Sequence, residues 1–455
     1  MFGIGQIMSW TAEVVIVPIS GTTATEIAGS VRDLIASGEL APRDLLPPVR
    51  TLAAELGVNR NTVAAAYRQL VAAGVAATQG RGGTMVTGMP QLAREGAGFG
   101  GRLIDLASGN PDPELLPDVL AAARRGEYRQ PLYGAPAVDP GLAEWAADGY
   151  AEDIAGQPFR VLVAGGAADA TERLLNAYLT RGDAVAVEDP CFLGTIGTVR
   201  LNGYRTAPVA VDHAGMRPEA LRAALESGAR AVVCTPRAHN PTGASLTAGR
   251  AAELRAILAE HPQVLIIEDD HFSAVSTVSY HRITPPQSAT WALVRSVSKF
   301  LGPDLRLALV AADEETARRL ETRLSAGTMW VSLLLQHTAR ELLLDPKARA
   351  RHERARTTYA ERSARLMKEL NARGISTPAA YRPDGLNVWI DLDTPARPVV
   401  DALARRGWLV RPGDLFATGE ADRQALRVTT ATLTEQRARE FAADLAAVLD
   451  DPDAA

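Results

Sequence analysis

The chain of 455 residues has a mass of 48.3 kDa, 47% hydrophobic residues and a net charge of −5. This length requires more than one domain, or one large domain with an appendage. The composition is that of an ordinary soluble globular protein, and no apolar run is long enough to span a membrane. The net charge excludes a protein that coats nucleic acid along its whole surface, although it permits one small DNA-reading module.

Two features bear on the compartment. Residues 1–20 contain one short apolar run, Val14–Val17, with no basic segment before it, which is too little for a signal peptide. Cys191 and Cys234 stand alone, without the spacing of metal ligands, as in a reducing compartment. We therefore expect a cytoplasmic protein with no metal site and no membrane partner.

Residues 21–88 have the pattern of three helices followed by a hairpin. Apolar side chains recur at helical spacing from Ile27 to Ile35, and Asn59 stands where it can cap a later helix. The helices are predicted over residues 27–38, 49–56 and 59–74, and the strands over residues 75–79 and 84–86. The glycine-rich tip between the strands carries Arg81, which predicts a basic wing beside a helix-turn-helix.

This head resembles the winged-helix domain of GntR-type bacterial regulators. The main segments that carry the resemblance are Leu46–Arg50, Leu56–Val63 and Gly80–Thr84. In such a fold the start of the third helix enters the major groove, while other basic residues contact phosphate or the minor groove. The residues expected to bind double-stranded DNA are Arg50, Arg60, Asn61, Thr62, Arg81 and Thr84.

The alternative for the head is a three-helix module that binds another protein. Residues 1–88 contain six arginines and six acidic residues, so their charges balance. From Arg43 to Gly88, however, five arginines stand against two acidic residues, a balance of +3 on the part that would read DNA. The local charge and the resemblance together favour DNA binding.

A glycine-rich stretch near residues 88–102 separates the head from the rest of the chain and is typical of a linker. The predicted division is an N-terminal arm over 1–20, a winged helix-turn-helix domain over 21–88, a linker over 89–102 and a body over 103–455, with a large part at about 125–345 and a small part at about 346–455. These lengths suit independent folding units.

Five strand-like apolar runs in the body each end in polar or glycine-rich residues. The runs cover residues 161–163, 185–187, 231–233, 264–267 and 291–294, with helical patterns between them. Such runs predict buried parallel strands, and ligands of open α/β sheets bind beyond the carboxyl ends of the strands. The body is therefore predicted to be an α/β domain with a site at one edge of its sheet.

Lys299 follows the fifth run and is one of only three lysines in the chain. Arginine cannot lose its proton to form an imine, whereas lysine can. The other lysines, Lys347 and Lys368, lie in charged stretches typical of solvated helix faces. Lys299 is therefore a candidate Schiff-base lysine, with a mere composition bias as the alternative.

The strand ends supply the other groups that pyridoxal 5′-phosphate requires. Asp269 offers a carboxylate to the pyridine nitrogen, Asn240 an amide to the ring oxygen, and Phe192 a flat apolar face. The phosphate site is predicted from Gly166, Ala167, Ala168, Ser296, Ser298 and Arg306. Each residue has an ordinary alternative as a helix cap, a turn or a core position, but their joint occurrence favours the cofactor.

The body resembles fold-type I aminotransferases over almost all its length. The motifs are Tyr133-Gly134, Gly165-Gly166-Ala167, Asp189-Pro190, His239–Gly243, Glu268-Asp269-Asp270, Ser296–Lys299 with Arg306, and Leu426-Arg427-Val428. The resemblance implies a mostly parallel sheet with flanking helices, a smaller α+β C-terminal part and a homodimer. It implies that Lys299 and Asp269 are the catalytic residues. It further implies that Arg427 binds a substrate carboxylate, that Asn240 also contacts the substrate or effector, and that Tyr133 reaches the phosphate of the neighbouring subunit.

His271 departs from the family pattern. Relatives usually carry a tyrosine directly after the two aspartates, where it bonds the ring oxygen of the cofactor. A histidine can donate a similar hydrogen bond, but its charge changes with pH. Cofactor binding is still expected, whereas efficient transamination is put in doubt.

A winged helix ahead of an aminotransferase-like body is the arrangement of the MocR-type regulators, a subgroup of the GntR superfamily. The leading hypothesis is a transcription regulator in which an amino acid or amine effector forms an external aldimine, releases Lys299 and shifts two heads on a DNA operator. The second hypothesis is an active class I/II aminotransferase with an accessory winged helix. A third is a DNA-binding protein whose body is only a dimerisation scaffold.

Overall fold

The computed structural model describes residues 19–42, 44–72, 75–78, 83–86, 103–154, 156–375, 377, 380–419 and 423–450. The chain divides into two compact units, the head Met1–Leu92 and the body Ala93–Ala455. No helix within the described ranges is long and apolar enough to cross a membrane.

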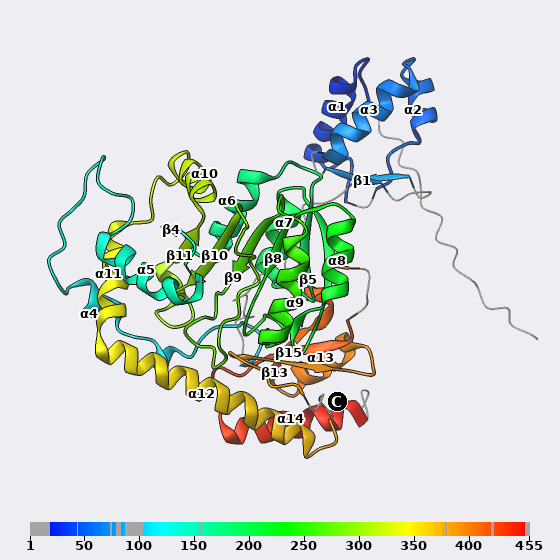
Figure 1. Ribbon diagram of the computed structural model, residues 1–455. Helices are drawn as coiled ribbons and strands as arrows, with labels where there is room; N and C mark the ends of the chain where they lie inside the picture. Colours follow the sequence, from blue (N-terminus) through cyan, green and yellow to red (C-terminus); the bar gives the residue numbers. More distant parts are fainter. Residues whose placement is uncertain are drawn as a thin grey trace, which may run out of the picture. The chain divides into compact units, whose positions relative to one another are not determined.

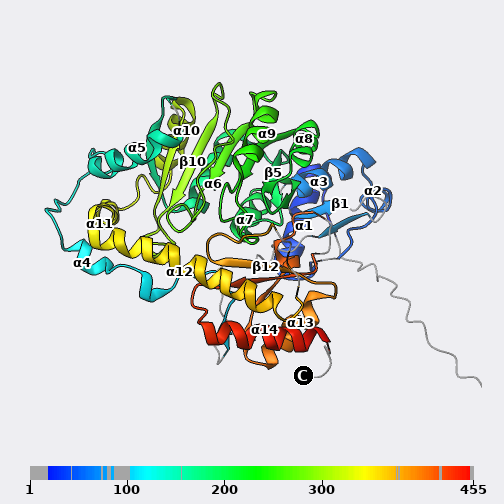
Figure 2. The same ribbon diagram turned by 60° about the horizontal axis from the view of Figure 1, so that its bottom comes forward.

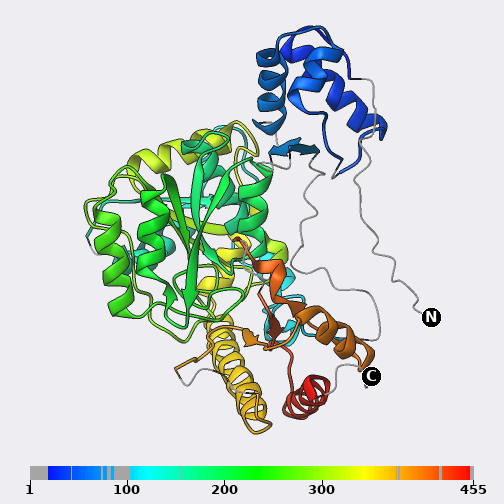
Figure 3. The ribbon, with the colours of Figure 1, turned by 90° about the vertical axis from the view of Figure 1, so that its right-hand side faces the viewer.

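The head packs three helices together with a two-stranded antiparallel hairpin (Figure 3). Its elements are α1 (Ala24–Ser37), α2 (Val49–Glu55), α3 (Arg60–Ala72), β1 (Ala76–Thr78) and β2 (Thr84–Val86). Thr23 and Glu26 form a capping box at the start of α1, and Gly38 ends this helix with a left-handed φ of 82°. The apolar faces of the helices meet in one core, which includes Ile27, Val31, Leu52, Val63 and Leu70.

These elements confirm the predicted winged helix-turn-helix. The amide N–H of Asn61 donates to Asn59 Oδ1 at 2.8 Å, so Asn59 caps the start of α3 as expected. In the hairpin, Thr78 pairs with Thr84. The tip between these strands, Arg81 included, lies outside the described residues except for Gly83.

The body is built on an eight-stranded sheet with helices on both faces (Figure 1). Its strands, in spatial order, are β4 (Arg160–Ala164), β11 (Ala308–Ala312), β10 (Trp291–Ser296), β9 (Leu265–Asp269), β8 (Ala229–Cys234), β5 (Ala184–Asp189), β6 (Arg205–Asp212) and β7 (Gly215–Met216). The run from β10 to β6 is parallel, whereas β11 and β7 are antiparallel to their neighbours. The mostly parallel sheet is as predicted.

Residue alternation along the strands divides the core between the two faces of this sheet. In β8, Val232 and Cys234 join one apolar cluster while Ala231 and Val233 join the other. The first face is covered by α5 (Pro140–Ile154), α8 (Pro218–Glu226), α9 (Ala248–Ala259) and α11 (Leu333–Leu344), and the second by α6 (Ala167–Tyr178), α7 (Leu193–Leu201) and α10 (Glu314–Ser325). Because both faces are covered, nearly every strand position is apolar.

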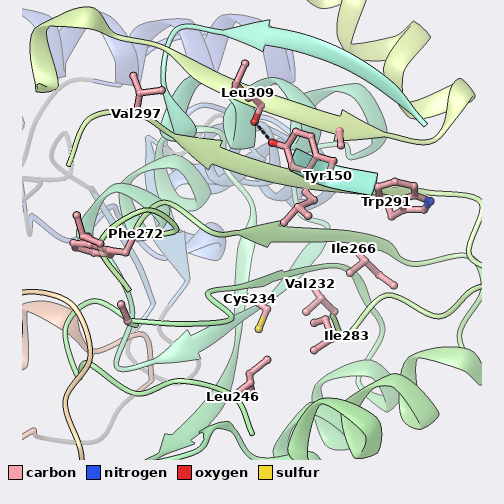
Figure 4. Packing of buried hydrophobic residues seen from close by; sticks show 14 of the residues in the cluster. Tyr150, Val232, Cys234, Leu246, Ile266, Phe272, Ile283, Trp291, Val297 and Leu309 are labelled. Atoms are coloured by element: carbon pink, nitrogen blue, oxygen red, sulfur yellow. Dashed lines mark hydrogen bonds between the residues drawn. The ribbon is translucent and has the colours of Figure 1, made fainter. Parts of the chain in front are cut away.

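Tyr150 shows how the first cluster accommodates a polar atom in an apolar setting. Its ring is buried, and its hydroxyl donates to the carbonyl oxygen of Leu309 at 2.9 Å (Figure 4). Burial raises the pKa of this phenol, so the tyrosine stays neutral and its hydrogen bond is kept. α5 is thereby joined to β11 by a specific bond as well as by packing.

A smaller α+β part completes the body. It consists of the antiparallel strands β12 (Asn387–Asp391), β15 (Ala425–Thr429) and β14 (Arg411–Pro412), the pair β3 (Ile104–Asp105) with β13 (Trp408–Leu409), and the helices α12 (Pro346–Asn371), α13 (Ala396–Arg405) and α14 (Glu435–Asp450). α12 and α14 lie side by side (Figure 2). The segment just after the linker therefore closes onto the C-terminal part through β3.

The parallel direction brings the predicted polar residues to one edge of the large sheet. β5, β9 and β10 end in Asp189, Asp269 and Ser296. β4 runs the same way as β10, because each is antiparallel to β11, and it leads into Gly165 and Gly166. The candidate functional residues therefore meet beyond this edge.

Candidate functional site

A cavity of about 230 Å³ opens at this sheet edge. Nine of the residues predicted to bind a cofactor line it: Ala167, Ala168, Phe192, Asn240, His271, Ser296, Ser298, Lys299 and Arg306. They come from four separate strand ends and from the start of α6. The fold thus assembles most of the predicted site from segments far apart in the sequence.

Lys299 stands on the turn after β10, with its amine in the cavity. Its Nζ donates to the carbonyl oxygen of Gly109 at 2.7 Å and lies 5.5 Å from the centre of the Phe272 ring. The Lys299 side chain is half-buried, so the position of its amine is restricted. A positioned amine in a small cavity suits reaction with a carbonyl group.

Asp269, the last residue of β9, is only 3% exposed. Its Oδ1 has no hydrogen-bond partner within the described part of the chain, and its Oδ2 lies 3.2 Å from Nδ1 of His271. A buried carboxylate oxygen without a donor is costly, so such atoms usually await a ligand. The oxygen is placed to accept from a protonated ring nitrogen.

The start of α6 forms an anion site. Gly166 caps this helix with φ of 106° and no side-chain hydrogen bond, which leaves the first amide groups of the helix to face the cavity at Ala167 and Ala168. Arg306 lies against the glycine, and its NH2 donates to the carbonyl oxygen of Gly165 at 3.0 Å. The φ of 106° at this position favours glycine, and a Cβ there would come within 2.7 Å of that guanidinium nitrogen and displace it.

Two serines extend the anion site from the other side. Ser296 Oγ accepts the amide N–H of Ser298 at 3.2 Å, and the two hydroxyls lie 3.1 Å apart. Both line the cavity. Hydroxyls, helix amides and a guanidinium are together the groups that bind a phosphate.

His271 lies between two aromatic rings. It stacks on Phe192 with centroids 5.3 Å apart and tilts against Phe272 at 4.6 Å. Neither ring nitrogen has a hydrogen-bond partner in the described residues, although Nδ1 faces the Asp269 carboxylate. The imidazole therefore has hydrogen-bonding capacity to offer a ligand in the cavity.

Arg427 is withdrawn from the cavity. It is 0% exposed on β15, donates from NH1 to Asn240 Oδ1 at 3.2 Å and also bonds the carbonyl oxygen of Ala107. Asn240 lines the cavity and Arg427 does not, so the arginine reaches the site only through the asparagine. In this arrangement a carboxylate in the cavity meets Asn240 and does not contact Arg427 directly.

Tyr133 is also absent from the cavity lining. It is 83% exposed and contacts Trp330 edge-on at 5.7 Å. Leu132 beside it is 77% exposed. Large exposed apolar side chains of this kind are typical of a surface that another chain covers.

Sequence reasoning missed one segment of the site, residues 107–110. Ser108 and Asn110 line the cavity, and the carbonyl oxygen of Gly109 holds Lys299. Pro303 was missed as well. The tripeptide Gly109-Asn110-Pro111 could have indicated this segment, because it is a turn sequence just after a short strand.

The two cysteines are not candidate nucleophiles. Both thiols are buried, and burial together with nearby carboxylates raises the pKa of Cys191 and of Cys234 well above the usual range. A thiol that stays protonated is inert.

In the head, the predicted DNA-binding residues lie at the start of α3 and near it. Arg50, Arg60 and Asn61 are exposed, whereas Thr62 and Thr84 are half-buried. Neither Arg50 nor Arg60 forms an ion pair with any described residue. Exposed cations beside the start of a recognition helix are the groups that contact DNA phosphate and base edges.

Known proteins resemble the chain along nearly its whole length. The family model described as "Aminotransferase class I and II" matches residues 102–445, and the model "Bacterial regulatory proteins, gntR family" matches residues 23–86. The vitamin B6 salvage pathway transcriptional repressor PtsJ of Salmonella typhimurium is 47% identical over 94% of this chain and 98% of its own length. The pyridoxine biosynthesis transcriptional regulator PdxR of Corynebacterium glutamicum is 28% identical over 90% and 95%.

Among solved structures, LysN of Thermus thermophilus matches with a TM-score of 0.66 and 24% identity. The match covers 77% of this chain and 93% of that enzyme, an α-aminoadipate aminotransferase crystallised with N-(5′-phosphopyridoxyl)-L-leucine. A likeness at this identity concerns the fold of the body alone.

Proposed function

This chain belongs to the aminotransferase class I and II family and carries a GntR-type head before that body, as the MocR-type regulators do, and we propose that it regulates transcription by sensing an amino compound through pyridoxal 5′-phosphate at Lys299. The observation that carries the proposal is the positioned Lys299 amine in a cavity beside buried polar atoms, on Asp269 and His271, that lack partners in the described residues. When bound, the cofactor supplies an aldehyde carbon with which amines condense.

The residues present fit this cofactor group by group. Asp269 Oδ1, buried and without a donor in the described residues, would accept from the protonated pyridine nitrogen. The start of α6, Arg306, Ser296 and Ser298 would hold the phosphate, Asn240 and His271 would serve the ring oxygen, and Phe192 would offer an apolar face to the ring. Lys299 and Asp269 thus correspond to the two catalytic residues that the family resemblance implies.

The sensing step rests on Lys299 and Arg427. An effector amine would displace Lys299, and the released Nζ would stay within reach of its present acceptor, the Gly109 carbonyl oxygen. An effector carboxylate would compete for Arg427 with its present partners, the Ala107 carbonyl oxygen and Asn240, and would thereby act on β15 in the small part. The body then has two states, one with Lys299 in place and one with the effector in its place. The effector produces a signal because it binds one of these states more tightly than the other.

We assign the output to a homodimer with two heads on a DNA operator. The exposed Leu132 and Tyr133 support a subunit contact at this surface. The family resemblance implies that Tyr133 reaches the partner's phosphate site. Two heads require two half-sites on the duplex.

The decisive variant is Lys299→Ala, with Lys368→Ala, an exposed lysine on α12, as the matched control. Wild type and control should show the absorbance band of lysine-bound cofactor, and amino acids that shift this band should change operator affinity. Lys299→Ala should lose both responses. The sensing mechanism is wrong if effector-dependent operator binding survives in Lys299→Ala.

DNA reading is tested at Arg60, at the start of α3, against Arg68 further along the same helix. With a duplex selected from random sequences, Arg60→Ala should weaken binding at least tenfold and lower the slope of log affinity against log salt by about 1. Arg68→Ala should change neither by as much. Equal effects of the two variants would refute the assignment of α3 as the reading helix.

A second candidate signal is the cofactor itself. Two relatives are named for vitamin B6 salvage and pyridoxine biosynthesis. In this chain the cofactor-binding residues line the cavity, whereas Arg427, the expected effector clamp, is fully buried. If loading is the signal, pyridoxal phosphate added to cofactor-free protein without any amine will change operator affinity. If the change requires an added amine, the first candidate holds.

An aminotransferase with an accessory head is the alternative function. His271, stacked on Phe192, stands where relatives carry a tyrosine, and this substitution is the reason to place sensing before turnover. Amino donor and keto acid should give no steady-state turnover with fully loaded wild-type protein. Turnover near about 1 s⁻¹ or faster, in the range of ordinary enzymes, would make the chain an enzyme first.

A further inference from the structure

A second cavity of the body lies next to the cofactor pocket, and its volume is about 290 Å³. It is bounded by α5, α11, the start of α12 and the ends of β10 and β11, and Ser296 lines both cavities. Its size is at the lower end of small-molecule pockets, which hold roughly 300–1,000 Å³.

The walls of this second cavity are mainly apolar and aromatic. Trp145, Tyr150 and Phe300 contribute rings, and Val297 and Leu343 contribute aliphatic surface. The only polar atom of the Tyr150 side chain is already used, because its hydroxyl donates to the Leu309 carbonyl oxygen (Figure 4). Such walls favour a flat apolar group.

The charges at the cavity floor are paired with one another. Arg237 binds both oxygens of Asp270 at 2.8 Å. Arg295 binds Asp270 Oδ2 at 3.0 Å and Asp153 at 2.5 Å. Two cations face two anions, so the floor is neutral and does not require a charged ligand.

Two polar side chains of α12 at this cavity have hydrogen-bonding capacity that no described residue uses. Arg349 is exposed and forms no ion pair or side-chain hydrogen bond with any described residue. His352 is only 8% exposed, lies edge-on to Phe300 at 4.7 Å, and its Nε2 is buried without a hydrogen-bond partner in the described residues. Burial lowers the pKa of His352 to about 4, so at neutral pH the imidazole acts as an uncharged hydrogen-bonding group.

We propose that this cavity is a second ligand site, separate from the cofactor pocket, for a small monocarboxylic acid with an aromatic or similarly flat apolar body. The apolar body occupies the space between Trp145, Tyr150 and Phe300. The carboxylate lies at the α12 side, where Arg349 supplies the charge and His352 a hydrogen bond. One cation over a neutral floor matches a single negative charge.

The site is coupled to the cofactor pocket through two short connections. Val297 and Ser296 lead directly to Lys299, and Ser296 bonds Ser298 in the anion site. Asp270, held by the floor arginines, lies between Asp269 and His271 in sequence. A ligand that shifts β10 or Asp270 therefore changes the surroundings of the cofactor, which gives the protein a second input.

The test uses the full chain and phenylacetate as probe, with neutral phenylacetamide as its matched analogue. Calorimetric titration should give one phenylacetate per chain and at least tenfold weaker binding of phenylacetamide. Arg349→Ala should weaken phenylacetate binding about tenfold, which is the effect expected for one charge-assisted hydrogen bond. Arg354→Ala, an exposed arginine of the same helix outside the cavity, should leave it unchanged.

Two further variants locate the binding. His352→Phe keeps the ring and its packing and should weaken phenylacetate binding several-fold. Lys299→Ala removes the reactive amine of the other pocket and should leave phenylacetate binding intact, so this result does not depend on the proposed sensing function. No saturable binding up to about 5 mM, equal effects of Arg349→Ala and Arg354→Ala, or loss of binding in Lys299→Ala would each overturn the proposal.

Coupling has its own readout in the cofactor-loaded protein. Phenylacetate should shift the absorbance of lysine-bound cofactor in wild type and in Arg354→Ala, and in Arg349→Ala the same shift should require about tenfold more phenylacetate. If the probe binds without any spectral change, the site stands and its role as an input to the cofactor pocket is refuted.

Discussion

Two neighbouring regions at the end of β9 differ in whether their buried charges are paired. On the cofactor side, Asp269 keeps one carboxylate oxygen without a donor, and His271 has two unpartnered ring nitrogens among the described residues. On the side of the second cavity, Asp270 is bound by both Arg237 and Arg295. These carboxylates are adjacent in sequence, and both are buried.

The difference separates a buried carboxylate that is open to a ligand from a buried carboxylate whose charge is already paired within the protein. Burial alone would lower the pKa of Arg295, but Asp270, Tyr150 and Asp153 raise it instead, so its charge is retained and neutralised inside the protein. Asp269 has no such cation among the described residues, and its charge is matched only when a ligand brings one. Removing each carboxylate should therefore have opposite consequences for stability and for binding.

The largest effect is expected from Asp270→Asn. Loss of this fully buried carboxylate leaves two half-buried guanidinium groups without their shared anion, and breaking a buried ion pair typically costs about 3–5 kcal/mol of unfolding free energy. Urea denaturation of the cofactor-free protein measures it. A loss below about 1 kcal/mol would show that the floor is not held by this pair of ion contacts.

A smaller effect, and of a different kind, is expected from Asp269→Asn. Because Asp269 Oδ1 has no donor to lose in the described structure, the unfolding free energy should change by less than about 1 kcal/mol. Affinity for pyridoxal phosphate should fall about 10- to 100-fold, since the amide cannot balance a protonated ring nitrogen. If this variant unfolds as readily as Asp270→Asn, the contrast between the two carboxylates is wrong.

At neutral pH the smallest effect is expected at His352, whose imidazole is already uncharged there and whose Nε2 has no hydrogen-bond partner in the described part of the chain. Its folded pKa of about 4 lies below the ordinary value of 6.5, so between these pH values the unfolded chain binds the extra proton. Stability should therefore decline as pH falls from about 6.5 towards 4, by up to about 1.4 kcal/mol per pH unit from this group. His352→Phe should lose this part of the slope in urea denaturation measured at a series of pH values, while the part from other groups persists.

Much of the fold was predictable because its strands are nearly continuous apolar runs. β5, β8 and β10 were located by Val185–Val187, Ala231–Val233 and Trp291–Val294, and their shared direction brings Asp269 and Lys299 to one edge. The cap at Asn59 was equally local, since it requires only the residue before the helix. Patterns that depend on neighbours in the chain are visible without the tertiary structure.

The contribution of residues 107–110 was not predictable in the same way. Gly109 meets Lys299 across 190 positions of the chain, and no periodicity links the two. The burial of Arg427 behind Asn240 and the paired floor under Asp270 also depend on distant segments. The second cavity, too, results from packing among α5, α11 and α12, which the helical patterns do not specify.

The sequence by itself determined the two-part organisation, the strand ends and the identity of the reactive amine, because each is expressed in local pattern or in residue chemistry. Lysine can form the bond that arginine cannot, wherever the chain places it. Only the tertiary structure decided which buried charges are satisfied, because Asp269 and Asp270 differ in their partners and not in their type. Charge pairing depends on the distances between segments that are far apart in the sequence, and folding sets those distances.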